Sequence, residues 1–216
     1  MPVSRAATLP KPRDTYRHGD LRRALIEAGI ALARIGGPDA VVLREATRRA
    51  GVVPNAAYRH FANREALLQA VRAAALANVA AAMEAQLARV ARRRRPAPDA
   101  RAGLRAVGTA YLEFAQRETG LFRTAFATAG DPRGAPDPAM AGPGGLNPFQ
   151  ILGAVLDRLV EAGVLPAARR PGAEYLAWSA VHGLALLVIE GPLRRLTPAQ
   201  IHDVGQRVLD MVEQGL

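Results

Sequence analysis

The stretch from Leu43 to Phe61 most constrains the fold, because it has the layout of two short helices joined by a tight turn. Leu43, Ala46 and Ala50 recur at three- and four-residue spacing and therefore share one face of a helix. Gly51 follows where that helix must stop, and glycine enters the left-handed conformation of such a turn at low cost. The sequence thus predicts a first helix that ends at a glycine turn.

The second helix of this hairpin is predicted to begin with a proline and to be polar on its outward side. Pro54 suits a first helical position, where its missing N–H costs nothing. The helix then carries Asn55, Tyr58, Arg59 and His60. A short helix that is polar, aromatic and basic outward fits a DNA major groove. Any αα-hairpin could use a glycine turn, however, so a purely structural role stays open at this point.

Charge is concentrated around the hairpin. The chain of 216 residues has a formal net charge of +10, and residues 1–64 contain twelve Lys/Arg against five Asp/Glu. Such a concentration is typical of a phosphate-binding surface, with a solvated basic terminus as the alternative. Before the hairpin, we expect Asp20 to cap a helix that ends at Gly36 and Gly37. Its apolar stripe consists of Leu21, Leu25, Ala28, Leu32 and Ile35.

Three segments of this region resemble a known family. They read Y-R-H-G-D-L-R (Tyr16–Arg22), L-R-E-A-T-R-R-A-G-V (Leu43–Val52) and A-A-Y-R-H-F-A-N-R-E-A-L-L (Ala56–Leu68). Together they are similar to the N-terminal domain of the TetR family of bacterial transcription regulators. The resemblance implies an all-α fold with a three-helix DNA-binding head at residues 16–64. A helical effector-binding and dimerisation domain would follow at residues 65–216, and residues 1–15 are expected to form a disordered arm.

The resemblance also implies which residues meet DNA. Base edges or thymine methyl groups would be faced by Pro54, Asn55, Ala57 and Tyr58, and the DNA backbone would be held by Arg44, Thr47, Tyr58, His60 and Arg64. Val53 and Arg59 complete the expected DNA-contacting set. Val53 departs from the family, which often has Ser or Thr there to cap the recognition helix and meet a phosphate; Val42 is a similar departure.

Two of these side chains have a second interpretation. Asn55 suits adenine's paired donor and acceptor, but it could instead cap a neighbouring amide at the start of the helix. His60 could donate to a phosphate or satisfy a polar edge of the core.

Further along, helix signals divide the rest of the chain. Asn63 is expected to cap a helix of some thirty residues, a rod of about 45 Å that could carry a displacement from body to head. Residues 130–146 are rich in glycine and proline and predict a loop, either a lid or an inert linker. Asn147 precedes a proline at a helix start, and Thr197 to Gln200 matches a capping box.

The last two predicted helices are too apolar for solvent. In the TetR family such a pair packs against its copy as a four-helix dimer interface, so the resemblance implies a homodimer through these helices. The segment W-S-A-V-H-G (Trp178–Gly183) also resembles a recurring TetR C-terminal domain with a Trp…His-Gly motif.

An all-helical body with clustered aromatic residues can enclose a ligand pocket among its helices. The candidate lining residues are Tyr111, Phe114, Phe122, Phe126, Trp178 and His182. Each aromatic residue could equally be ordinary core, and His182 could be a satisfied core histidine. Such a lining would suit a hydrophobic or planar compound, although the sequence does not identify one.

Other function classes find little support. The four histidines lack metal-ligand spacing, and no phosphate-binding glycine loop, nucleophile elbow or paired carboxylates occur, so we expect neither an enzyme nor a metal or cofactor. No cysteine is present and no run of about eighteen apolar residues lacks charge, which suits the cytoplasm and predicts no membrane span. The sequence favours a dimeric repressor released from a palindromic operator by a small ligand. A ligand-independent architectural DNA-binding protein is the alternative.

Overall fold

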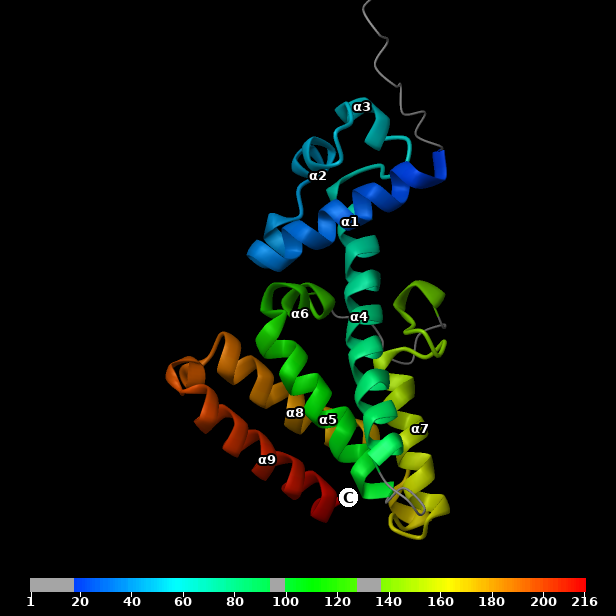
Figure 1. Cartoon of the computed structure of the whole chain (residues 1–216), viewed down its shortest axis with the longest axis vertical. Coiled ribbons are helices and arrows are strands. Elements are labelled where there is room, and N and C mark those ends of the chain that lie inside the picture. The colour runs from blue at the N-terminus through cyan, green and yellow to red at the C-terminus, as the bar shows by residue number, and fades with distance from the viewer. Residues whose placement is uncertain (1–17, 94–99, 128–136) are drawn as a thin grey trace, which may run out of the picture.

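The computed structural model describes residues 18–93, 100–127 and 137–216, which form helices and loops and contain no strand, as predicted. A small helical head lies at one end of the molecule and a larger bundle at the other (Figure 1). The α-helices are α1 (His18–Gly36), α2 (Leu43–Arg49), α3 (Pro54–Ala57), α4 (Arg64–Arg93), α5 (Ala100–Arg117), α6 (Thr119–Ala125), α7 (Pro148–Glu161), α8 (Ala173–Ile189) and α9 (Pro198–Gly215). The expected arm at residues 1–15 lies outside the described residues.

The head places α1 against the hairpin of α2 and α3. Gly51 has a φ of +69°, which confirms the left-handed turn predicted between the two helices. Pro54 is the first residue of α3, again as predicted. Regular helix ends at Ala57, and the chain continues as a turn in which the amides of His60 and Phe61 both donate to the Ala57 carbonyl.

Two expectations for α1 were wrong. The helix already includes His18, so Asp20 lies inside its first turn and is not its cap. Ile35 was expected in the apolar stripe but is 74% exposed, whereas Leu25 and Leu32 are buried. The stripe ends at Leu32 because the glycines after Ile35 turn the chain into the short 3-10 helix η1 (Gly37–Ala40).

Helix α4 links the head to the body. Its cap is confirmed, since the Asn63 side chain accepts a hydrogen bond from the Ala66 amide at 2.9 Å. Its first turns pack beneath the head through Leu67 and Val71, and later turns enter the body through Val79 and Met83. Among the described residues, the span Arg64–Ala91 is long and apolar enough to cross a membrane, but half of it is buried inside the protein, as expected for a core helix.

Helices α5 and α7 pack against the lower part of α4, and α8 and α9 pack against α5 (Figure 1). The predicted cap at Asn147 and the predicted capping box of Thr197 with Gln200 are confirmed, and Asn147 forms a capping box as well, with Gln150 at the start of α7. Of the predicted loop at residues 130–146, the structure describes 137–146, which contain the 3-10 helix η2 (Pro138–Met140). This segment is tied to α4, because the Gly144 amide donates to both carboxylate oxygens of Glu84, at 3.1 and 3.0 Å.

Helix α6 joins the body to the head at a second point. Gly120 lies so close to the C-terminal end of α1 that an added Cβ would stand 2.2 Å from the Ala33 carbonyl oxygen and 2.7 Å from that of Arg34. Arg34 also pairs with Glu118 at 2.9 Å. The head is therefore connected to the body by α4 and by the contact between α1 and α6.

Candidate DNA-binding surface and ligand pocket

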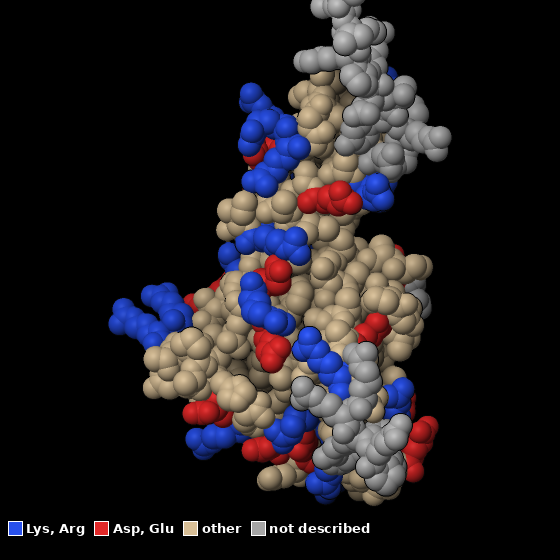
Figure 2. All heavy atoms as spheres, in the orientation of Figure 1, with Lys and Arg blue, Asp and Glu red and all other residues tan. Residues whose placement is uncertain are grey.

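The exposed end of the head carries most of the side chains predicted to meet DNA. Arg44, Val53, Pro54, Asn55, Tyr58, Arg59 and Arg64 are exposed, and His60 is half-buried. Basic side chains also gather over the α2 side of the head (Figure 2). Asn55 makes no hydrogen bond within the described residues, and the residue at the cap of α3 is Val53, with no side-chain bond. The Asn55 amide is thus available to an outside partner.

Two predicted DNA contacts disagree with the structure. Thr47 is 1% exposed, and its hydroxyl donates to the Arg44 carbonyl at 2.7 Å, so it does not face a phosphate. Ala57 is fully buried and packs inside the head, so it does not face a base. Helical periodicity allowed both faces, because small residues such as these fit the core and the surface equally.

Arg64 and Arg48 are exposed but already engaged. Arg64 donates to the carbonyls of Val41 and Pro38, at 2.9 and 2.7 Å, and so fastens η1 to the start of α4. Arg48 donates to both carboxylate oxygens of Glu45, and these bonds lower the pKa of that carboxyl group. Arg44 and Arg59 have no such internal partner in the described part of the chain, which leaves their guanidinium groups free for phosphates.

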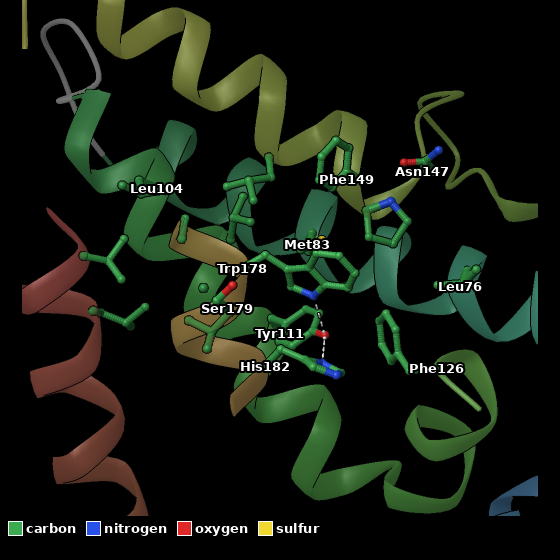
Figure 3. Close-up of a pocket in the computed structure, with 18 of the residues that line it drawn as sticks. Leu76, Met83, Leu104, Tyr111, Phe126, Asn147, Phe149, Trp178, Ser179 and His182 are labelled. Carbon is green, nitrogen blue, oxygen red and sulfur yellow. Dashed lines mark hydrogen bonds between the residues drawn. The ribbon is translucent and has the colours of Figure 1, made fainter. Parts of the chain in front are cut away.

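A cavity of about 640 Å³ lies in the body between α4, α5, α7, α8 and α9. Four predicted residues line it: Tyr111, Phe126, Trp178 and His182 (Figure 3). Phe114 and Phe122 do not. Phe114 is 6% exposed, and Phe122 is fully buried behind Tyr111, with its ring edge-on to the tyrosine at 5.2 Å between centroids. These two predictions were wrong because core and cavity lie on the same inward side of a helix.

The sequence reasoning missed other lining residues. Phe149 extends the aromatic wall beside Trp178, and Leu76 and Met83 of α4 also line the cavity (Figure 3). Arg72, Arg105 and Glu213 add charged groups. Phe149 directly follows the Asn147–Pro148 helix start, and an aromatic residue at that position is the one signal in the sequence that could have pointed to it.

A hydrogen-bonded chain crosses the cavity wall. The Trp178 indole Nε1–H donates to the Tyr111 hydroxyl at 3.1 Å, and that hydroxyl lies 2.7 Å from His182 Nδ1. The tyrosine oxygen accepts from the indole and shares a second hydrogen bond with His182 Nδ1. Burial lowers the pKa of His182 and raises that of Tyr111, so both are neutral.

Comparison with known proteins matches both halves of this architecture. Residues 25–71 match the model of bacterial regulatory proteins of the tetR family, and residues 104–212 match a tetracyclin repressor-like C-terminal domain. The chain belongs to the TetR family. It is a DNA-binding transcription regulator by family, and the matches indicate no enzyme. A search of curated proteins finds no match.

Several solved structures share the fold over nearly the whole chain. A protein of unknown function from Rhodococcus sp. RHA1 is 25% identical, with a TM-score of 0.72 over 94% of this chain and 99% of that one. A TetR variant from Acinetobacter baumannii AYE in complex with minocycline is 19% identical, with a TM-score of 0.59 over 88% and 93%. FadR from Bacillus subtilis in complex with stearoyl-CoA is 12% identical, with a TM-score of 0.58 over 90% and 98%.

The pH dependence of thermal stability tests whether His182 is unprotonated in the folded protein. Because the folded protein resists protonation of this ring, the unfolded chain binds an extra proton once the pH falls below about 6.5, the ordinary histidine pKa. We expect thermal stability to fall from about pH 7.5 to pH 5.5, and His182→Gln to make that fall smaller. His202→Gln, at an exposed position on α9, is the control. An unchanged profile in His182→Gln would contradict a neutral buried His182.

Proposed function

We propose that this TetR-family protein is a homodimeric repressor, released from a roughly palindromic operator by a small, mainly apolar ligand. The observation that carries the proposal is that one short helix contacts both the cavity and the head. Phe126, directly after α6, lines the cavity, whereas Gly120 at the other end of α6 lies against α1. A regulator of this kind acts in the cytoplasm.

In the DNA-bound state, the two α3 helices would enter successive major grooves about one helical turn apart. Asn55 is the residue we assign to direct base reading, with Pro54 and Tyr58 beside it; Val53 also belongs to this exposed surface. Arg44 and Arg59 would hold phosphates, and half-buried His60 could donate to one. Arg64 has a positioning role through its bonds to Val41 and Pro38.

The dimer would form through α8 and α9. Four of the exposed large apolar side chains lie on these two helices: Leu176, Leu186, Leu187 and Met211. On α8, Leu176, Gly183 and Leu187 follow a spacing of seven and four residues and so share one face. An apolar face of this kind on two adjacent helices supports a four-helix interface with a second copy.

Ligand binding and DNA binding would be coupled through α4 and α6. Arg72 of α4 lines the cavity and donates to the Ala125 carbonyl at the end of α6 at 3.1 Å. A ligand that displaces Phe126 therefore acts on both connections to the head. The coupling free energy between two such binding sites is typically about 1–3 kcal/mol, and it lowers the affinity for DNA and the affinity for the ligand by the same factor.

Selection of bound sequences from a random DNA pool, followed by affinity measurements against salt, tests this function. We expect an enriched palindrome that is preferred about a thousandfold or more over other DNA. The alternative of an architectural DNA-binding protein predicts no enriched sequence and weak, salt-sensitive binding throughout.

Asn55→Ala tests the base-reading assignment on that selected operator. We expect discrimination between the operator and a variant changed at the contacted base to fall by about 1–3 kcal/mol. Arg44→Ala is the matched control, since loss of a phosphate contact should weaken all DNA by a similar factor. Full discrimination by Asn55→Ala in competition binding would remove this residue from base reading.

A further inference from the structure

One end of the cavity, beside α9, contains a charged cluster with an unsatisfied oxygen. Arg105 of α5 donates through Nη1 to Gln206 at 3.0 Å and through Nη2 to Glu213 Oε2 at 2.8 Å, and Nη2 also contacts Asp210. The second carboxylate oxygen of Glu213, Oε1, is buried and has no hydrogen-bond partner among the described residues. Glu213 itself lines the cavity, together with Leu209 and Val212 of the same helix.

A buried carboxylate oxygen without a donor is destabilising, and the nearby protein groups do not provide one. Arg105 directs Nη1 to Gln206 and Nη2 to Glu213 Oε2, and the adjacent lining residues Leu209 and Val212 are aliphatic. The last torsion of a glutamate side chain is broad, so rotation about it can present Oε1 to the cavity that Glu213 lines. A donor that enters the cavity would therefore find a free acceptor at this end.

The charges of the cluster favour a cation as that donor. A single guanidinium group is shared by two carboxylates, Asp210 and Glu213. An anionic ligand group would have to compete with both carboxylates for Arg105. An ammonium group would instead balance the excess negative charge of the two carboxylates. Two further charged residues line the cavity, Asp137 and Arg72, and Arg72 lies eleven residues before the lining residue Met83 on α4, or about 16 Å along the helix.

We propose that the ligand of this cavity is an amphiphilic amine, whose protonated amino group donates to Glu213 Oε1 and whose apolar body lies against Tyr111 and Trp178. The proposal rests on the cavity being the ligand site of the proposed function. An apolar body suits the largely aromatic and aliphatic wall, and aromatic rings near an ammonium group add cation–π attraction. An ammonium group held by a carboxylate also avoids the cost of an unpaired buried charge.

The test uses three probes that share one chain and differ only in the polar end: decylammonium, decan-1-ol and decanoate. Binding to the full chain is measured by titration calorimetry at neutral pH, below the concentrations at which the probes aggregate. We expect decylammonium to bind at least about tenfold more tightly than the other two, because hydrogen bonds to charged groups are the stronger ones. Glu213→Gln, which keeps the shape of the side chain, should remove this preference.

Asp210→Asn is the matched control, because Asp210 bonds the same arginine but is not among the residues that line the cavity. It should keep the preference for decylammonium. Equal or tighter binding of decanoate, no saturable binding of decylammonium, or a preference that survives Glu213→Gln would each overturn the proposal. A thermal melt of each variant establishes that it is folded.

Operator release is measured separately, so that the two proposals can fail independently. Decylammonium that binds through Glu213 but leaves the operator complex intact would support the ligand class and contradict induction. Release of the operator by decanol or decanoate, with no preference for the amine, would support induction and overturn the ligand class.

Discussion

Gly120→Ala is expected to lower operator affinity by about tenfold or more, because it separates two helices that hold the head against the body. The added Cβ would stand 2.2 Å from the Ala33 carbonyl oxygen and 2.7 Å from that of Arg34. These are backbone atoms, which cannot rotate away as a side-chain end can. Relief therefore requires a shift of α1 relative to α6, and overpacking of this kind costs about 1–3 kcal/mol.

The shift matters for DNA because the two recognition helices of a dimer must match the spacing of successive major grooves. A displaced α1 carries α2 and α3 with it, so the distance between the two recognition helices of the dimer no longer matches the spacing of the major grooves. Fluorescence anisotropy with the selected operator measures the affinity, and a thermal melt measures the stability. Phe126 lines the cavity at the other end of α6, and titration of an apolar probe shows whether the cavity is still formed in the variant.

Gly103→Ala is the control for helix propensity. This glycine lies inside α5, and its added Cβ would meet Val155 and Leu87 only at ordinary contact distances of 3.6 and 3.8 Å. Replacement of a mid-helix glycine by alanine then stabilises by about 0.5–1 kcal/mol. We expect Gly103→Ala to keep full operator affinity. If Gly120→Ala behaved in the same way, the contact between α1 and α6 would not set the position of the head.

Local signals were the part of this fold that the sequence predicted well. The glycine turn at Gly51, the first helical position of Pro54 and the caps at Asn63, Asn147 and Thr197 each depend on a few neighbouring residues. Such features survive in almost any tertiary context, because the backbone groups that they satisfy belong to the same turn.

Tertiary context decided the features that were predicted wrongly. Thr47 and Ala57 are small enough for either side of their helices, and only the packing of α1 over the hairpin places them inside. Phe114 and Phe122 point inward as expected, but whether an inward side chain meets another side chain or a cavity depends on helices far away in sequence. Glu213 could not be found at all from its neighbours, since its partner Arg105 is 108 residues away.

Leu187→Glu is expected to convert the protein to a monomer and thereby remove most operator binding. Leu187 is 44% exposed on α8, in line with Gly183 and Leu176, on the face that we propose meets a second copy. Burial of a leucine side chain contributes about 1.5–3 kcal/mol. A symmetric interface contains each substitution twice, so the variant loses two such terms and must also desolvate two carboxylates. We expect the dimer dissociation constant to rise at least about a hundredfold.

Loss of the dimer should weaken operator binding, because a monomer can contact only one half-site of a palindrome. Ile35→Glu is the matched control: Ile35 is 74% exposed on α1 and belongs to neither α8 nor α9, so its replacement should leave the dimer intact. Sedimentation velocity gives the oligomeric state and anisotropy gives operator affinity over the same concentration range. A dimeric Leu187→Glu protein with normal operator affinity would place the interface elsewhere. A monomer that still bound the full operator tightly would show instead that the two heads assemble on DNA without the body, which is incompatible with control of DNA binding by a ligand in the body.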